Sequence, residues 1–387
     1  MRSDCTPALR MAVDSASSAK PGASSGPLAI TPKKSGGTAA AAPAGRHRAA
    51  TTAASVPRDF FGVMANGPLD APNFALDAES TAMRGAGVQS ERMEIAWDLV
   101  EPAQGQYDFA LTDRKVLAAA RAGLDVLALI VRSPSWAARH PGQPFSSPRD
   151  SADYAAFATT LVARYGPGGT LWAEHPEVSA RPVRAWQIWN EPNLAVYWRE
   201  QPFMRGYARL LGAAYAAIKQ ADPKATVAMA GLANFSWRDL ARLFAKGATK
   251  LRFDVAAVHP FSGRPSNAVK IVALNRDVLD RNGARRKPIW LTELTWSSAK
   301  GKKAKLTKNW ETTEAGQAVR LRQAYALFVR ARRALRLERI YWYTWVTVDR
   351  GSPNSFDYSG LRTQLPDGSV VDKPAAGAFR AVVRRYG

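Results

Sequence analysis

Eight short apolar runs alternate with longer helical patterns between residue 60 and the end of this 387-residue chain. The short runs are rich in β-branched and aromatic residues and have the length of buried strands, whereas the longer segments are rich in alanine. Strands that alternate with helices indicate a parallel sheet. Eight such pairs over about 330 residues favour a (β/α)8 barrel, or TIM barrel, over a doubly wound sheet.

The boundaries of the elements follow from the same patterns. Strands are predicted over residues 60–66, 88–97, 125–134, 185–191, 226–234, 253–261, 288–296 and 339–347. Helices are predicted over residues 112–122, 152–165, 204–221, 267–282, 313–337 and 375–386. The turn after the first strand, Asn66-Gly67-Pro68-Leu69, lacks the Gly-x-Gly-x-x-Gly pattern of a dinucleotide-binding sheet, and no P-loop pattern occurs.

The composition excludes several other classes of protein. With 46% hydrophobic residues the chain is too apolar to be disordered throughout, yet no apolar run reaches the roughly 18–20 residues of a membrane helix. Cys5 is the single cysteine, which excludes an internal disulfide framework and a cysteine-based zinc site. The four histidines are scattered without metal-ligand spacing. We therefore expect neither a metal nor a cofactor.

The first 57 residues differ from the rest of the chain. They consist mainly of Ala, Ser, Thr, Pro and Gly and contain almost no aromatic residues, so they cannot bury enough surface to offset the entropy of ordering. We expect residues 1–57 to be a disordered low-complexity tail and residues 58–387 to be one barrel domain. The tail contains no apolar run typical of a secretory signal, because Met11-Ala12-Val13 ends at Asp14.

Two glutamates stand at the ends of predicted strands among aromatic residues. Glu191 lies in the segment Trp186-Gln-Ile-Trp-Asn-Glu-Pro-Asn193, and Glu293 lies in Ile289-Trp-Leu-Thr-Glu-Leu-Thr-Trp296. The carboxyl ends of barrel strands meet at one face, so strands four and seven would hold the two side chains across the same mouth. Glycosidic cleavage needs such a pair, with one carboxyl protonated to assist the leaving oxygen and one charged.

A single glutamate at a strand end is more often a helix cap, an ion-pair partner or a solvated loop residue. Asn190-Glu191-Pro192 alone is also a plausible turn. Two glutamates at strands four and seven, each flanked by tryptophans, are much less expected by chance. The sequence therefore favours a catalytic pair.

Residues 60–387 resemble the retaining glycoside hydrolases of the clan-A superfamily. In that family an asparagine and the acid/base end strand four, and the nucleophile ends strand seven. The resemblance implies that Asn190 binds the sugar 2-hydroxyl, that Glu191 is the acid/base and that Glu293 is the nucleophile. Arg92 matches an arginine on strand two that lies beneath the nucleophile, and Trp345 matches a tryptophan on strand eight that floors a sugar subsite.

Other parts of the sequence bear on the same resemblance. Residues 101–108 carry the "EP…G.YD" pattern common in these enzymes, and the chain is most similar to families 39 and 5, which include enzymes that cleave bacterial exopolysaccharides. The resemblance favours a secreted or cell-surface location, a carbohydrate substrate, no cofactor and a monomer. His259 is expected to line the site without transferring a proton. Trp136 and Trp296 are candidates for stacking on sugar rings.

Strands six and three depart from the family pattern. His259-Pro260-Phe261 stands where many relatives have His-x-Tyr, whose tyrosine hydroxyl bonds the nucleophile; Phe261 cannot donate that bond. Arg132 and its neighbours occupy the place of a usual histidine at strand three. The first change could alter the pKa of Glu293, or leave Arg92 to orient Glu293 alone.

The chain carries 54 Lys and Arg against 32 Asp and Glu, a formal net charge of +22. Five lysines lie between Lys300 and Lys308, just beyond Glu293. A cationic mouth could concentrate an acidic polysaccharide, such as one that contains uronates or phosphates. A lysine run is, however, usually a solvated surface.

Three alternatives to hydrolysis fit parts of the sequence. A carbohydrate-binding barrel without activity would fit the missing tyrosine, although both glutamates are present. A transglycosidase would use the same residues and differ only in its acceptor. A nucleic-acid-binding protein would fit the charge, but no helix-turn-helix, zinc-finger or RNA-recognition signature occurs, so no nucleic acid is expected as a partner.

Overall fold

The computed structural model describes residues 56–143, 145–246, 251–302 and 310–387. The predicted tail therefore lies outside the described residues, apart from its last two positions. Val56 already packs against the hydrophobic core, and the carbonyl of Pro57 accepts a hydrogen bond from the backbone of Phe60 over 3.2 Å. The described chain is thus already packed against the core just before the first strand.

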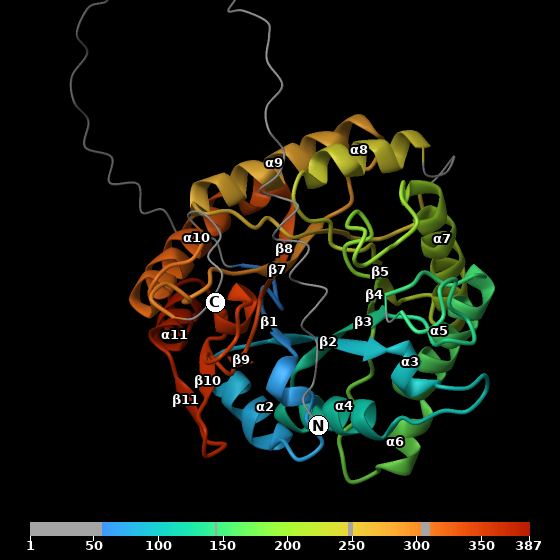
Figure 1. Ribbon diagram of the computed structural model, residues 1–387, viewed down its shortest axis with the longest axis horizontal. Coiled ribbons are helices and arrows are strands. Elements are labelled where there is room, and N and C mark those ends of the chain that lie inside the picture. The colour runs from blue at the N-terminus through green and yellow to red at the C-terminus, as the bar shows by residue number, and fades with distance from the viewer. Residues whose placement is uncertain (1–55, 144, 247–250, 303–309) are drawn as a thin grey trace, which may run out of the picture.

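Eight parallel strands form the centre of the molecule, in the order β5-β4-β3-β2-β1-β8-β7-β6 (Figure 1). Two isolated parallel bridges, Ala228 to Val255 and Leu232 to Val258, link the two outer strands and nearly close the barrel. The (β/α)8 prediction is confirmed. The strands are β1 Phe61–Ala65, β2 Ser90–Ala96, β3 Asp125–Val131, β4 Ala185–Ile188, β5 Thr226–Ala228, β6 Ala256–Val258, β7 Ile289–Leu294 and β8 Leu337–Trp342.

Helices surround the strands on the outside of the barrel (Figure 1). They are α2 Leu76–Gly85, α4 Ala110–Ala122, α5 Ser151–Tyr165, α7 Met204–Ala221, α8 Ser236–Lys246, α9 Pro265–Arg281, α10 Glu314–Leu335 and α11 Pro374–Tyr386, with short helices α3 Trp97–Val100 and α6 Thr170–Glu174. The sequence patterns predicted six of these. A helix was expected after every strand, but no bounds were predicted for α2, in which only Leu76 and Met83 are large buried apolar residues, or for α8, in which only Leu240 and Leu243 are.

The predicted eighth strand is interrupted. Strand β8 ends at Trp342, and the chain continues into β9 Val346–Thr347, which pairs outside the barrel with β10 Arg362–Gln364. Strand β11 Val370–Asp372 completes this small sheet. The sequence patterns did not predict it.

An apolar plug fills the bottom of the barrel. Its six residues come from six different strands or strand ends: Leu127, Ala185, Ala228, Val255, Trp290 and Tyr341. Gly62 on β1 makes room for this plug, because a Cβ atom there would lie 2.5 Å from the ring of Tyr341. The hydroxyl group of Tyr341 pairs with Ser90 on β2 over 3.0 Å. Two residues further along β2, on the same face, Arg92 begins a polar layer above the plug.

No helix within the described parts of the chain combines the length and the apolar character needed to cross a membrane.

Candidate active site

Glu191 stands just beyond the end of β4, where the backbone turns sharply out of the sheet. Trp189 and Glu191 have φ angles of 66° and 40°, in the left-handed region that costs a non-glycine residue about 1–3 kcal/mol. The indole of Trp189 donates to the carbonyl of Tyr197 over 2.7 Å, and the amide of Glu191 donates to the carbonyl of Gly231 over 3.1 Å. These bonds hold the turn and fix the direction in which Glu191 points.

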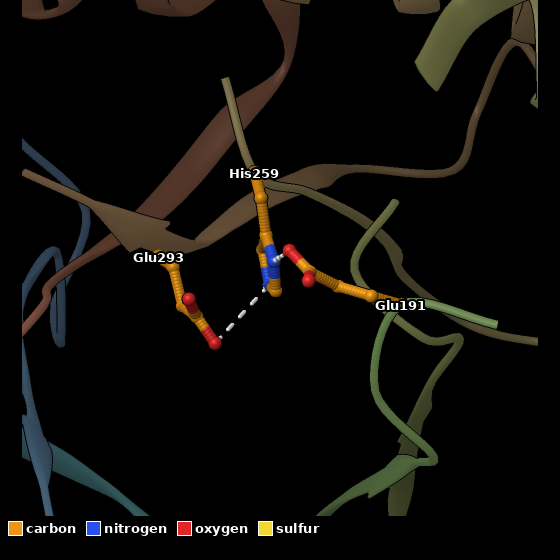
Figure 2. A group of neighbouring side chains, drawn as sticks. All are labelled: Glu191, His259 and Glu293. Atoms are coloured by element: carbon orange, nitrogen blue, oxygen red, sulfur yellow. Dashed lines mark hydrogen bonds and ion pairs between the residues drawn. The ribbon is translucent and has the colours of Figure 1, made fainter. Parts of the chain in front are cut away.

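Glu293 comes from the opposite side of the barrel, in β7. Glu293 is 7% exposed and Glu191 is 6% exposed. Figure 2 shows both side chains on either side of His259. One carboxylate oxygen from each glutamate and one ring nitrogen of His259 all lie within 4.8 Å of one another. The structure therefore brings together the two glutamates that the sequence placed at strands four and seven.

Arg92 is fully buried beneath this pair, and its guanidinium group donates hydrogen bonds to three polar side chains. Nη1 donates to Oε1 of Glu293 over 2.8 Å, and Nη2 donates to Oδ1 of Asn190 over 3.0 Å. Nε donates to Oε1 of Gln187 over 2.7 Å. Because a guanidinium group only donates, these contacts assign the amide oxygens of Asn190 and Gln187, and they leave the Asn190 amide nitrogen available to a ligand.

His259 lies between the two glutamates. Its Nδ1 is 2.7 Å from Oε1 of Glu191, and its Nε2 is 2.9 Å from Oγ1 of Thr292 and 3.8 Å from Oε1 of Glu293. The ring fits because residue 231 is glycine; a Cβ atom there would lie 2.0 Å from Nε2. His259 thus contacts Glu191 and lies close to Glu293; its expected role of lining a substrate site stays a prediction.

The two glutamates have different electrostatic surroundings. Burial raises the pKa of Glu191 to about 8, against a smaller opposite effect of Arg92. Burial lowers the pKa of His259 to about 4, with Glu293 acting in the opposite direction. At neutral pH Glu191 is therefore mainly protonated and His259 is neutral. Glu293 instead has a cationic guanidinium group as its direct partner.

The Glu191, His259 and Glu293 atoms have a spacing that could in principle surround a metal ion. Both ring nitrogens of His259 are already engaged, however: Nδ1 bonds Glu191 and Nε2 bonds Thr292, while Oε1 of Glu293 accepts from Arg92. A buried guanidinium group 2.8 Å from one ligand atom would also repel a cation. The arrangement suits proton transfer better than metal binding.

The four aromatic candidates occupy different environments. Trp296 and Trp345 are buried, and their indole groups donate to the carbonyl of Ser262 over 2.6 Å and to Glu79 over 2.7 Å, respectively. Neither ring offers an accessible face for a sugar in this structure. Trp136 is half-buried and donates to the carbonyl of Glu101 over 3.0 Å. Phe261 is also half-buried, and its ring packs edge-on against aromatic neighbours; ring centroids lie 5.3 Å from Phe356 and 6.2 Å from Trp310.

Three further residues border the site, and sequence reasoning did not single them out. Tyr343 follows β8, is half-buried, and accepts a hydrogen bond from Asn66 over 3.4 Å. Tyr197 is 7% exposed; its pKa is raised well above the ordinary value by burial, and then by the charges of Glu191 and Glu293. Glu94 shares the inward face of β2 with Arg92, and burial raises its pKa. The period-two pattern of residues 88–97 could have identified Glu94.

Fold and site together define a (β/α)8 barrel with a carboxyl pair at its mouth. No protein-family model matches the chain, and no curated protein sequence matches it. Solved structures do share its fold. A family 39 glycoside hydrolase from Bacteroides cellulosilyticus superposes with a TM-score of 0.62 at 21% identity, over 85% of this chain and 64% of that one. The chain thus corresponds to less than two thirds of that enzyme's length.

Two other solved structures are similar to a comparable extent. A GH5_18 protein from Bifidobacterium longum subsp. infantis gives a TM-score of 0.60 at 18% identity, covering 86% of this chain and 79% of its own. An exo-β-1,4-mannosidase from an Opitutaceae bacterium gives 0.56 at 16% identity, covering 84% and 59%. These likenesses show the fold, which is one that glycoside hydrolases use.

Proposed function

We propose that this protein is a β-glycosidase that cleaves an O-glycosidic bond with retention of configuration. The observation that carries the proposal is the pairing of two buried carboxyl groups with different surroundings. Glu191 has a pKa raised to about 8, and Glu293 is bonded to Arg92, while their nearest ligand oxygens lie within 4.8 Å. One group can therefore donate a proton where the other can attack.

The reaction has two steps. In the first step Glu293 attacks the anomeric carbon while the proton of Glu191 moves to the leaving oxygen, so that a covalent glycosyl ester replaces the glycosidic bond. In the second step Glu191 takes a proton from water, the water oxygen attacks the anomeric carbon, and the Glu293 carboxylate leaves. The free amide nitrogen of Asn190 is placed to donate to the sugar 2-hydroxyl, because Arg92 occupies its oxygen.

The carboxyl spacing supports retention over inversion. Retaining enzymes hold their carboxyl groups about 5–5.5 Å apart, whereas inverting enzymes leave room for a water molecule at about 6.5–9.5 Å. One oxygen of each carboxyl group lies within 4.8 Å of the other, which is nearer to the spacing of retaining enzymes. The same residues would also support transglycosylation, in which a sugar hydroxyl replaces the water molecule in the second step.

We further propose that the substrate is a poly- or oligosaccharide, and that a polymer with acidic groups would benefit from the net charge of +22. Two of the described cations near the mouth form ion pairs. Lys302 contacts Glu314 and Asp349 at 2.9 and 3.0 Å, and Arg132 contacts Asp98. Lysines 303, 305 and 308 lie outside the described residues. Attraction of an acidic polymer would therefore act over a long range and would weaken as salt rises.

Proton NMR during cleavage of a panel of aryl β-glycosides tests the function and its stereochemistry together. We expect the β-anomer to appear first, with mutarotation later, and Glu293→Gln to abolish turnover. Glu177→Gln, which changes an exposed glutamate, is the matched control and should leave the rate unchanged. Initial release of the α-anomer would refute retention. An absence of turnover on every glycoside, with the fold intact, would favour a carbohydrate-binding barrel.

A further inference from the structure

Resting on the proposed function, we propose that Gln187 and Thr292 are positioning residues that fix His259 as the Nδ1–H tautomer and thereby place the catalytic proton of Glu191 on Oε2. The four groups Arg92, Gln187, Thr292 and His259 form one hydrogen-bonded chain that ends at Glu191. We call this chain the Arg92 relay. In each of these hydrogen bonds, the groups present determine which partner donates and which accepts.

The direction of the chain is set at Arg92. The guanidinium group can only donate, so Oε1 of Gln187 is the acceptor of the 2.7 Å bond from Nε. The amide nitrogen of Gln187 then faces the other way. It donates to the carbonyl of Met229 over 3.3 Å and to Oγ1 of Thr292 over 3.2 Å, which uses both of its hydrogens.

Thr292 accepts this bond through Oγ1, and its own hydroxyl hydrogen determines which partner donates in the next bond. Its hydroxyl group has one hydrogen, and the second neighbour of Oγ1 is Nε2 of His259 at 2.9 Å. If Thr292 donates to Nε2, its hydroxyl hydrogen has an acceptor and the bond from Gln187 is kept. If His259 donated instead, the hydroxyl hydrogen would remain without a bond at a fully buried position, which is unfavourable.

The tautomer of His259 follows from this link. With Nε2 as an acceptor and burial holding the ring neutral, the ring hydrogen must be on Nδ1, which donates to Oε1 of Glu191 over 2.7 Å. Oε1 is then occupied as an acceptor, so the carboxyl hydrogen of Glu191 is placed on Oε2. The opposite tautomer would draw that hydrogen toward Nδ1 and withhold it from the leaving oxygen.

The packing around the relay excludes solvent. Arg92, Gln187, Thr292 and His259 are each fully buried in the structure. Gly231 positions both residues of the His259–Glu191 bond. Its carbonyl accepts a hydrogen bond from the amide of Glu191 over 3.1 Å, and its missing Cβ leaves the space that the His259 ring fills. The relay transfers no proton itself: in both reaction steps the hydrogen moves only between Oε2 and the reacting oxygen.

Thr292→Val tests the relay, with Thr292→Ser as its matched control. Valine keeps the shape and removes the hydroxyl group, whereas serine keeps the hydroxyl group. For aryl glycosides with poor leaving groups we expect Thr292→Val to lower the rate of the first step about 10- to 100-fold with little change in KM, because acid catalysis is impaired. For dinitrophenyl glycosides, whose leaving groups need no proton, the loss should be within about 3-fold. Thr292→Ser should resemble the wild type with both. Equal losses with both leaving groups would show a merely structural role and overturn the proposal.

Nitrogen NMR of the histidine rings separates this inference from the proposed function. The His259 signal, assigned by its loss in His259→Asn, is expected to show the Nδ1–H tautomer in the wild type and a mixture in Thr292→Val. An Nε2–H tautomer in an active enzyme would overturn the relay and leave the glycosidase intact. An Nδ1–H tautomer in a protein without glycosidase activity would contradict the proposed function and leave the tautomer assignment intact.

Discussion

Nη1 of Arg92 lies 2.8 Å from Oε1 of Glu293, and the arginine side chain is fully buried. This pair is the electrostatic anchor of the site, since the same guanidinium group also bonds Asn190 and Gln187. Breaking a buried ion pair by removing one partner leaves an uncompensated charge, which typically costs about 3–5 kcal/mol.

Arg92→Met should therefore weaken both stability and activity. We expect the free energy of unfolding to fall by about 3–5 kcal/mol at pH 7, because Glu293 loses its buried counter-charge. Urea unfolding followed by circular dichroism measures this loss. Arg139→Met, at an exposed arginine, is the control and should change the free energy by less than about 0.5 kcal/mol. A change of similar size in both variants would contradict the anchoring role of Arg92.

The rate should depend on the protonation of Glu191. Its pKa is about 8 in the folded protein, so kcat/KM for substrates with poor leaving groups should fall as pH rises through about 8. The alkaline limb should be absent with a dinitrophenyl substrate, whose leaving group needs no proton, and it should also be absent in Glu191→Gln, which has no carboxyl group to titrate at this position. A pH–rate profile over pH 4–10 checks both points. An alkaline limb that persists unchanged in Glu191→Gln would show that another group titrates.

The same group should make stability depend on pH. A carboxyl group whose folded pKa of about 8 exceeds its unfolded value of 4.5 binds its proton more tightly in the folded protein. Its contribution is complete below pH 4.5 and is lost as pH rises through about 8. Glu191→Gln should therefore gain in melting temperature relative to the wild type between pH 5 and pH 9. A difference that is constant across this range would be contrary to the raised pKa.

Gly231→Ala should displace His259 from its place between the glutamates. The added Cβ would lie 2.0 Å from Nε2, a distance that forces the ring to move. We expect kcat to fall by at least about tenfold while the barrel still folds, because His259 no longer orients Glu191. Gly377→Ala is the control, since no atom lies within 4 Å of its added Cβ. Steady-state kinetics with a thermal melt distinguishes the two variants.

Substitutions of Tyr343 and Trp345 test which aromatic residue after β8 contacts the sugar. Tyr343→Ala removes a half-buried ring at the site and should raise KM about tenfold. Trp345→Phe removes the bond from the indole to Glu79 and should lower stability by about 1–2 kcal/mol without a change in KM. The reverse outcome, in which Trp345→Phe alone raises KM, would support the subsite role that family resemblance implies for Trp345.

The strand pattern explains why so much of the fold could be predicted. The apolar run of residues 125–134 and the alternation around Glu293 predict two strands. Their predicted ends lie close to the observed ends of β3 and β7. The positions of Glu191 and Glu293 at the mouth follow from the topology of a barrel alone. Arg92 could be placed on the inner face of β2 by the same reasoning.

Other features depend on contacts between distant parts of the chain. Strand β4 ends three residues earlier than predicted, because Trp189 and Glu191 adopt left-handed backbone angles held by Tyr197 and Gly231. Strict alternation through residues 339–347 would place Tyr343 and Trp345 on one face. The chain leaves the sheet after Trp342, so this periodicity no longer applies and Trp345 packs on Glu79.

The most direct test of the central claim is covalent trapping with 2-deoxy-2-fluoro-β-glycosides that carry a dinitrophenyl leaving group. The fluorine slows both steps, and the reactive leaving group lets the first step proceed, so the glycosyl ester accumulates. We predict one added sugar mass, located by peptide sequencing on Glu293, in the wild type and in Glu177→Gln but not in Glu293→Gln. A label on a different residue, or turnover that survives in Glu293→Gln, would contradict the assignment of Glu293 as the nucleophile.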